Sequence, residues 1–348
     1  MSYVHGDAFT INGSGYGTRS VDLDIFDDCS GADIEDIWPG VVAGGYGLTY
    51  QTVAGAGRSV ALPHTHVTQY MAGNASTDSG YGMVFHDVTF SGTKKVFACL
   101  YRRHDPNWVF GSSCNATPDT LNDNNHKFFG YSSSGSVLGV PNWYNDCVGN
   151  QKCSINSSHT NGLTSVDGLG ALSLDSEVTG GSGASDQDPW LATNWPKWEY
   201  RFSGASSGAT VKFLINNGSI YNSSAENTDD EAGNTRRIWL GSWTRVRNSN
   251  CWTFLGDVVL VGGADAWKRV MLANNATYAN ATITEFQPLT SWANTAIQGT
   301  INQGRLPDGN AWLFVFDEND AEIDSVAVTL GAGGFPASTA TLMPQIAL

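Results

Sequence analysis

The sequence has little positive charge. Its 348 residues include 18 lysines and arginines against 33 aspartates and glutamates, which gives a formal net charge of −15. A nucleic-acid-binding protein carries a basic face, so this balance argues against a nucleic-acid partner. Long apolar runs are also missing, because none approaches the roughly 18 residues needed to cross a bilayer. We therefore expect neither a nucleic-acid nor a membrane partner.

Glycine and aromatic residues, in contrast, are plentiful. Glycine occurs 40 times, aromatic residues make up 11% of the chain and hydrophobic residues 41%. This apolar content is enough to bury a core. Helical periodicity is nearly absent, and strand-like runs separated by Gly, Asn, Ser and Asp turns recur instead. The sequence therefore predicts an all-β fold.

The runs also show which faces the strands present. The clearest runs are 83–90, 95–102, 127–131, 198–202, 210–216, 237–241 and 253–261. Alternation in the fourth run places Trp198, Tyr200 and Phe202 on one face and Glu199 and Arg201 on the other. A polar Gly/Ser turn joins this run to the next one as a hairpin. Many strands with one strongly apolar face predict two stacked antiparallel sheets.

The composition shifts near residue 284. Three further strands are expected at 296–301, 311–317 and 323–330, and the acidic run 317–324 is interpreted as a solvated hairpin. The tail after them ends in apolar residues, which need a groove on this chain or on a neighbour. The chain begins without a basic and then apolar segment, so we expect no secretory signal.

Three stretches carry a resemblance to a known superfamily. They are Asn125-His126-Lys127-Phe128-Phe129, the hairpin from 198–202 to Phe213-Leu214-Ile215-Asn216-Asn217-Gly218, and Phe254–Leu260 with Lys268-Arg269-Val270. Together they resemble the concanavalin A-like lectin/glucanase superfamily, in its branch of laminin-G-like modules and of heparin-lyase-type and glucuronan-lyase-type polysaccharide lyases. The resemblance implies an antiparallel jelly-roll β-sandwich.

The C-terminal part resembles a second, smaller unit. Glu285-Phe286-Gln287-Pro288, Ser291-Trp292 and Trp312–Asp317 resemble a short Ig-like (IPT/TIG-type) module. The expected organisation is an N-terminal arm over 1–20, a jelly-roll domain over 21–283, an Ig-like β-sandwich module over 284–332 and a C-terminal tail over 333–348.

A groove on one sheet of the jelly roll is the expected ligand site. A polysaccharide lyase needs a base and a cation that neutralises the uronate, and a glycan-binding site needs a ring for stacking and hydrogen-bonding side chains. Strand alternation supplies the glycan-binding candidates Tyr101, Arg103, His126, Arg201, Lys212, Arg237 and Trp239. No catalytic residue among them is assigned.

Two functions from different classes stay open. The first is a virion surface structural protein, a phage decoration, head-fibre or tail-fibre component, whose jelly roll binds host or environmental polysaccharide. Its arm or tail would contact other virion subunits or a second copy of the chain in a homo-oligomer. The second is a secreted, extracellular polysaccharide lyase or glycosidase that acts by β-elimination or hydrolysis in the jelly-roll groove. The acidic, Gly-rich composition and the missing leader favour the first.

The cysteines and acidic turns give weaker signals. The six cysteines contain no C-x-x-C pair, which argues against a zinc knuckle or a thioredoxin-type site. Cys147 and Cys153 bracket a short polar loop and are the candidate disulfide, while a buried free thiol is an alternative for Cys99. No cofactor or metal is expected, although a structural Ca²⁺ at the acidic turn 229–231 is a second interpretation.

Overall fold

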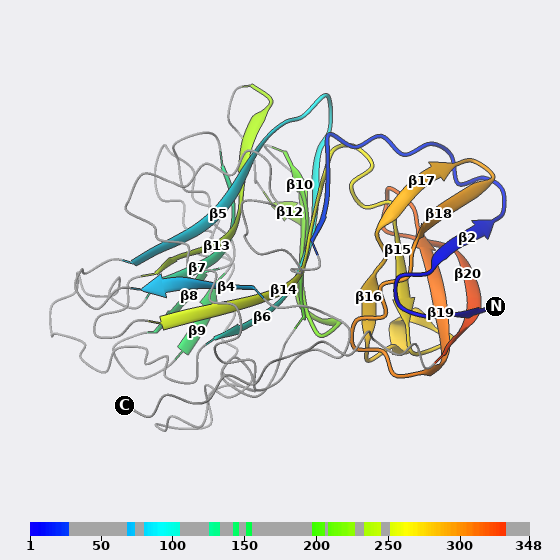
Figure 1. Cartoon of the computed structure of the whole chain (residues 1–348). Coiled ribbons are helices and arrows are strands. Elements are labelled where there is room, and N and C mark those ends of the chain that lie inside the picture. Colours follow the sequence, from blue (N-terminus) through cyan, green and yellow to red (C-terminus); the bar gives the residue numbers. More distant parts are fainter. Residues whose placement is uncertain are drawn as a thin grey trace, which may run out of the picture.

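The computed structural model describes residues 1–27, 68–73, 80–104, 125–132, 142–145, 151–154, 197–205, 208–226, 233–244 and 251–331. Within this part the chain is built from β-strands, with one short 3-10 turn at Tyr278–Asn280. Figure 1 shows the strands gathered into a large and a small sandwich. No helix in the described part is long and apolar enough to span a membrane.

The large sandwich is an antiparallel jelly roll. Its seven-stranded sheet has the order β12-β11-β10-β6-β14-β3, with β4 also paired to β14, and its five-stranded sheet has the order β5-β13-β7-β8-β9. The strands are β3 (Leu23–Asp27), β4 (Thr68–Gly73), β5 (Gly80–Thr89), β6 (Lys94–His104), β7 (Asn125–Ser132), β8 (Asn142–Asn145), β9 (Gln151–Ser154), β10 (Lys197–Gly204), β11 (Ala209–Ile215), β12 (Gly218–Glu226), β13 (Thr235–Thr244) and β14 (Cys251–Gly262).

The expected hairpin and its alternation are confirmed. β10 pairs with β11 in antiparallel register, with Tyr200 opposite Phe213. The rings of Tyr200 and Phe213 stack at 4.9 Å between centroids, and Trp198 lies 5.3 Å from the same ring. Aromatic cross-strand contacts of this kind stabilise a sheet and fix its register.

The small sandwich combines both ends of the described chain. One sheet has the order β1-β20-β19-β15-β16 and the other β17-β18-β2. The strands are β1 (Ser2–Tyr3), β2 (Ala8–Asn12), β15 (Arg269–Ala273), β16 (Thr284–Phe286), β17 (Leu289–Ala293), β18 (Ala296–Thr300), β19 (Gly309–Phe316) and β20 (Glu322–Leu330). β1 runs parallel to β20, whereas the other pairs in these two sheets are antiparallel.

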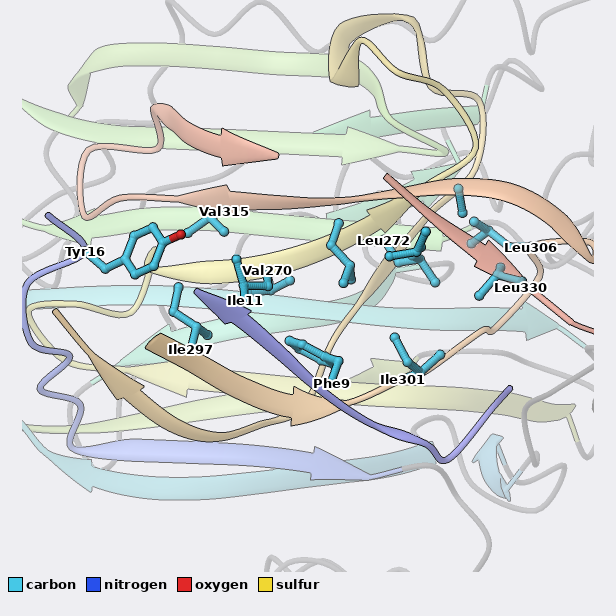
Figure 2. Close-up of a cluster of buried hydrophobic side chains, with 13 residues drawn as sticks. Phe9, Ile11, Tyr16, Val270, Leu272, Ile297, Ile301, Leu306, Val315 and Leu330 are labelled. Atoms are coloured by element: carbon cyan, nitrogen blue, oxygen red, sulfur yellow. The ribbon is translucent and has the colours of Figure 1, made fainter. Parts of the chain in front are cut away.

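The N-terminal segment differs from the expected arm, because it supplies β1 and β2 to this sandwich. In β2, Phe9 and Ile11 are buried, while the alternate residues of the strand are exposed. Figure 2 shows Phe9 and Ile11 inside the core of the small sandwich, which is completed by Tyr16, Val270, Leu272, Ile297, Ile301, Leu306, Ala311, Leu313, Val315, Val328 and Leu330. The period-2 pattern of a half-buried strand therefore accounts for the position of β2.

A similar difference concerns Arg269-Val270, which carried part of the jelly-roll resemblance. β15 contains these residues and pairs with β16 and β19 of the small sandwich. The small sandwich therefore begins before residue 284 along the chain. Whether it is an Ig-like module stays a prediction.

A continuous apolar contact joins the two sandwiches. Phe97 and Cys99 of β6 and Val259 and Val261 of β14 come from the seven-stranded sheet. They pack against residues of the small sandwich and of the segments next to β15, namely Ala266, Trp267, Met271, Ala273, Ala281, Phe286, Phe314 and Phe316. Val96–Tyr101 of β6 and Val258–Val261 of β14 are therefore buried on both faces, which explains why these stretches are near-continuous apolar runs.

We expect Phe9→Ala to lower the free energy of unfolding by about 3–5 kcal/mol, because it leaves a cavity in the small-sandwich core. Thr10→Ala, at the exposed neighbouring position of the same strand, is the control and should change it by less than about 0.5 kcal/mol. Chemical denaturation of the full chain measures both. Equal effects of the two variants would mean that β2 is not part of the core.

Candidate functional site

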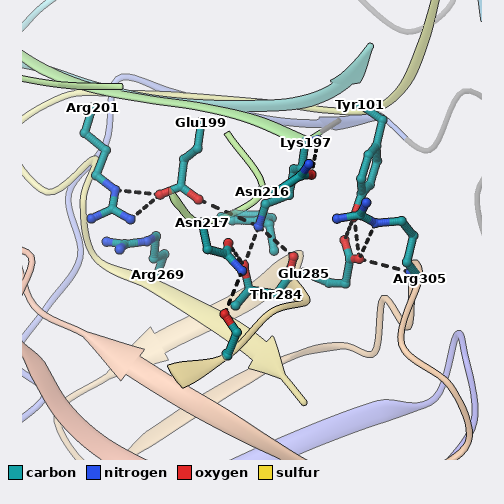
Figure 3. Close-up of polar contacts among 12 residues, drawn as sticks. Tyr101, Lys197, Glu199, Arg201, Asn216, Asn217, Arg269, Thr284, Glu285 and Arg305 are labelled. Atoms are coloured by element: carbon teal, nitrogen blue, oxygen red, sulfur yellow. Dashed lines mark hydrogen bonds and ion pairs between the residues drawn. The ribbon is translucent and has the colours of Figure 1, made fainter. Parts of the chain in front are cut away.

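One face of β10 carries three buried charged side chains. Lys197, Glu199 and Arg201 alternate with the core aromatics of this strand, yet their exposed fractions are only 1%, 2% and 6%. Charged side chains are rarely buried to this extent unless they are paired. Glu199 pairs with Lys197 and Arg201, and these two cations also bind residues of the small sandwich, which covers this face of the seven-stranded sheet (Figure 3).

Asp320 is the acidic centre of this contact. It lies in the β19–β20 turn with φ 67° and its side chain is 5% exposed. Arg201 of β10 donates to it at 2.5 Å, and Lys212 of β11 and Arg269 of β15 each donate at 2.6 Å. One carboxylate therefore binds cations from both sandwiches.

Hydrogen bonds within the β19–β20 turn fix the position of the Asp320 carboxylate. Asp317 Oδ1 accepts hydrogen bonds from the backbone N–H groups of Asn319 and Ala321, both at 2.8 Å, as in an Asx turn. This bonding accompanies the left-handed backbone of Asp320, a conformation that Asp adopts more readily than most residues. The expectation of a solvated hairpin over 317–324 is wrong for Asp320, because a turn on the edge of one sandwich is covered by the other.

The charges around Asp320 stabilise one another. Burial opposes the ionisation of Asp320, but Arg269, Arg201 and Lys212 outweigh it and hold the pKa of the carboxyl below its usual range. Burial likewise opposes ionisation of Glu199, and Arg201, Lys197 and Arg269 again lower its pKa. The Arg269 guanidinium also lies 4.2 Å from the ring centre of Phe316, a cation–π contact. Both carboxylates are therefore ionised and paired at neutral pH.

A second polar group links β10 to β16. The Lys197 ammonium donates to the Thr284 carbonyl at 2.6 Å and to the Thr284 hydroxyl. That hydroxyl donates to Asn217 Oδ1 at 2.5 Å, and Asn217 Nδ2 donates to the Ala281 carbonyl at 3.3 Å. Asn216 and Asn217 both have positive φ in the β11–β12 turn. The β11–β12 turn therefore contacts the small sandwich through Asn217.

The third polar group is centred on Tyr101 and Glu285. The Tyr101 hydroxyl donates to both carboxylate oxygens of Glu285. The Arg305 backbone N–H donates to Glu285 Oε1 at 3.0 Å, and Arg305 Nε donates to the Tyr101 hydroxyl at 3.1 Å. The Arg305 guanidinium lies 4.7 Å from the Tyr101 ring centre. Figure 3 shows these three side chains meeting at one end of the contact.

A tyrosine, a carboxylate and cations are the residue types that a β-elimination site uses. Here, however, the protonation and burial of Tyr101 and Glu285 do not suit catalysis. Burial and the adjacent Glu285 raise the pKa of Tyr101 well above its usual value, so the hydroxyl keeps its proton. Burial also raises the pKa of Glu285. A general base must lose its proton and reach the substrate, whereas Tyr101 is 1% exposed. The cluster therefore joins the two sandwiches, with the Tyr101 hydroxyl and the Glu285 carboxylate buried between them.

The seven candidate glycan-binding residues do not share one sheet, so that part of the expectation is wrong. Tyr101, Arg201 and Lys212 lie on the seven-stranded sheet and contact the small sandwich. Arg103 lies on the same sheet, whereas His126, Arg237 and Trp239 lie on β7 and β13 of the five-stranded sheet. The side chains of these last four residues lie outside the described part. Alternation finds the faces of a strand but does not tell which sheet the strand joins.

Other expectations fall partly or wholly outside the described residues. They include the candidate disulfide Cys147–Cys153 and the acidic turn 229–231. Cys99 is a buried free thiol, as one of the two interpretations had it, and burial raises its pKa. Among the described side chains no group of three or more His, Cys, Asp or Glu is arranged to hold a metal ion.

Sequence reasoning missed Asp320, Glu285, Lys197 and Arg305 as partners in one contact. Glu285 lies in a stretch interpreted as part of an Ig-like module, Asp320 lies in the run interpreted as a solvated hairpin, and Lys197 and Arg305 belong to no motif. The only signal was an apolar pattern on both faces of β6, which indicates that the seven-stranded sheet is covered on both sides.

The fold defines this chain as an all-β protein with a jelly-roll sandwich and a second, smaller β-sandwich packed on it. No protein-family model matches the sequence, and no curated protein does.

Some solved structures are distantly similar. An endo-β-1,4-glucuronan lyase from the fungus Trichoderma reesei is 9% identical, with 69% of this chain and 95% of that chain covered and a TM-score of 0.39. Alginate lyase Aly36B is 10% identical, with 74% and 97% covered and a TM-score of 0.41. The metal-free lectin I-B4 from Griffonia simplicifolia is 12% identical, with 68% and 98% covered and a TM-score of 0.31.

We expect Asp320→Asn to lower the free energy of unfolding at pH 7 by about 3–5 kcal/mol, because it leaves buried cations without their shared carboxylate. The depressed pKa of Asp320 means that its contribution is complete above the unfolded-state value near 4 and is lost as the pH falls below it. The variant should therefore lose stability less steeply than the parent below about pH 4. Glu322→Gln, an exposed carboxylate on β20, is the control. Parallel pH–stability curves for parent and Asp320→Asn would contradict the role of Asp320.

Proposed function

We propose that this chain is a non-catalytic surface protein, a virion decoration or fibre component, whose jelly roll binds polysaccharide through its five-stranded sheet. The observation that carries the proposal is the buried polar face of β10. It removes Tyr101 and Arg201 from any open groove, because the small sandwich covers them, and it ties the half-buried Lys212 to Asp320. Of the remaining candidates, His126, Arg237 and Trp239 lie on the five-stranded sheet.

Backbone register supports the five-stranded sheet as the binding sheet. β13 pairs with β5 on one side and β7 on the other, so Arg237 and Trp239 lie at central positions. They alternate with Arg236 and Ile238, which are 1% and 0% exposed. His126 pairs with Thr244 at the other end of β13. Strand alternation thus predicts that positions 237 and 239 face away from the sandwich core.

The interface between the two sandwiches supports the proposed role as a structural component of a particle. Interfaces between domains that stay mobile are modest and polar, whereas this one combines an apolar cluster with a buried ionic network. The two sandwiches therefore move together. A rigid, acidic, Gly-rich body suits display on a particle surface better than it suits a hinged enzyme.

A panel of neutral and uronate polysaccharides tests the proposal. We expect retention on at least one immobilised glycan, without absorbance from unsaturated uronate and without new reducing ends. Trp239→Ala should weaken retention about tenfold or more if its ring stacks on a sugar. Ile323→Ala, at an exposed apolar position of the small sandwich, is the matched control and should retain the parent value.

The outcomes separate the two classes of function. Unsaturated product or new reducing ends would make the chain a lyase or a glycosidase. Failure to bind any glycan in the panel would overturn the binding half of the proposal. Neighbouring genes for virion proteins would support the proposal that the chain is a virion component, and neighbouring genes for polysaccharide uptake would contradict it.

A further inference from the structure

The small sandwich has one edge strand with none of the usual protection against pairing. β2 forms the end of its three-stranded sheet, and its sequence, Ala8-Phe9-Thr10-Ile11-Asn12, contains no charge and no proline. Its register with β18 is regular throughout. Exposed edge strands normally carry charge, proline or a bulge, because their free N–H and C=O groups are a template for another strand.

The other edge strands in the described sheets are all protected. β1 and β16 are only two and three residues long, and the pairings of β12, β17 and β4 are irregular in register. β3, β5 and β9 carry charged residues, among them Asp24, Asp87 and Lys152. β2 therefore stands apart among them as a regular and uncharged edge.

The hydrogen-bond phase of β2 shows which of its groups face outward. The Gly13 N–H donates to the Thr295 carbonyl, and the Ile301 N–H donates to the Asp7 carbonyl. In an antiparallel ladder the bonded pairs alternate, so the odd-numbered residues of β2 bond to β18. The N–H and C=O groups of Ala8, Thr10 and Asn12 therefore point away from β18. All three residues are exposed.

We propose that two copies of this chain pair through β2, antiparallel and about a two-fold axis at Thr10. In this register Thr10 faces Thr10 of the second copy, and Ala8 faces Asn12. The outward groups of these residues then form three bonded pairs, and the two three-stranded sheets become one continuous six-stranded sheet. A two-fold axis requires this kind of self-complementary contact.

Charge favours a second copy as the occupant. With a net charge of −15, two copies repel each other, and an uncharged contact surface adds no close like-charge pairs to that repulsion. β2 provides one, and the outer residues of β18 beside it are Ala296, Gln298 and Thr300. The nearest acid, Asp7, would face Gly13 of the other copy, so the two Asp7 carboxylates lie at opposite ends of the contact. This inference does not depend on glycan binding.

Analytical ultracentrifugation of the full chain over roughly micromolar to millimolar concentration tests the pairing, because a contact of this size is weak. We expect a reversible monomer–dimer equilibrium. Thr10→Lys places two like charges opposite each other at the axis and should raise the dissociation constant about tenfold or more. Gln298→Lys adds the same charge on the same face of the sheet, one strand inward, and should leave the dimer largely intact.

A second variant separates pairing from folding. Because the Thr10 N–H points away from β18, Thr10→Pro removes an outward donor without breaking the ladder within the chain, and proline is tolerated at such edge positions. It should dimerise less but keep the parent circular dichroism spectrum. A parent chain that is monomeric at every concentration would overturn the proposal. A dimer that survives Thr10→Lys, or that Gln298→Lys disrupts equally, would also overturn it.

Discussion

The burial of charged residues on one face of β10 is the constraint on which the rest of this structure depends. Glu199 pairs with Lys197 and Arg201 within the strand, and the small sandwich supplies the remaining partners, Asp320 for Arg201 and Thr284 for Lys197. A buried ion pair adds little net stability compared with apolar packing, but losing one partner leaves an unpaired buried charge. The network therefore acts mainly on specificity, since it admits one placement of the small sandwich. The apolar cluster beside it supplies the attraction.

This contact also decides which functions the described part of the chain supports. A tyrosine beside an arginine, a lysine and a carboxylate is a set of groups that can abstract and neutralise charge. Here Tyr101 gives its hydrogen bond to Glu285 and is shielded from solvent by the packing around it. The same residue types on an open sheet would suggest catalysis. Residue type alone therefore does not distinguish a catalytic site from a structural contact. Because these residues are buried, we expect a ligand site on the five-stranded sheet instead.

The sequence predicted the fold better than the site. The period-2 alternation of 198–202 gave the hairpin, its inward aromatics and its polar face correctly, because alternation is a local property of a strand. The same pattern could not show that the polar face is covered, because the covering residues Asp320 and Glu285 lie far along the chain. Asp320 looked solvated because acidic turns usually are. β2 was missed as a strand because its five residues run directly into a glycine-rich segment, and only Phe9 and Ile11 mark its buried face.

The N-terminal strands also contact residues that lie far along the chain. β1 and β2 close the small sandwich from the other end of the chain, so its core forms only when residues about 300 positions apart come together. The apolar and ionic interface between the two sandwiches then holds the small sandwich on the jelly roll. The structure thus predicts that both sandwiches unfold as one cooperative unit. Scanning calorimetry of the full chain tests this most directly. A single transition whose calorimetric and van't Hoff enthalpies agree is the expected result. Two separable transitions would contradict the account, because the sandwiches would then be stable independently of their shared interface.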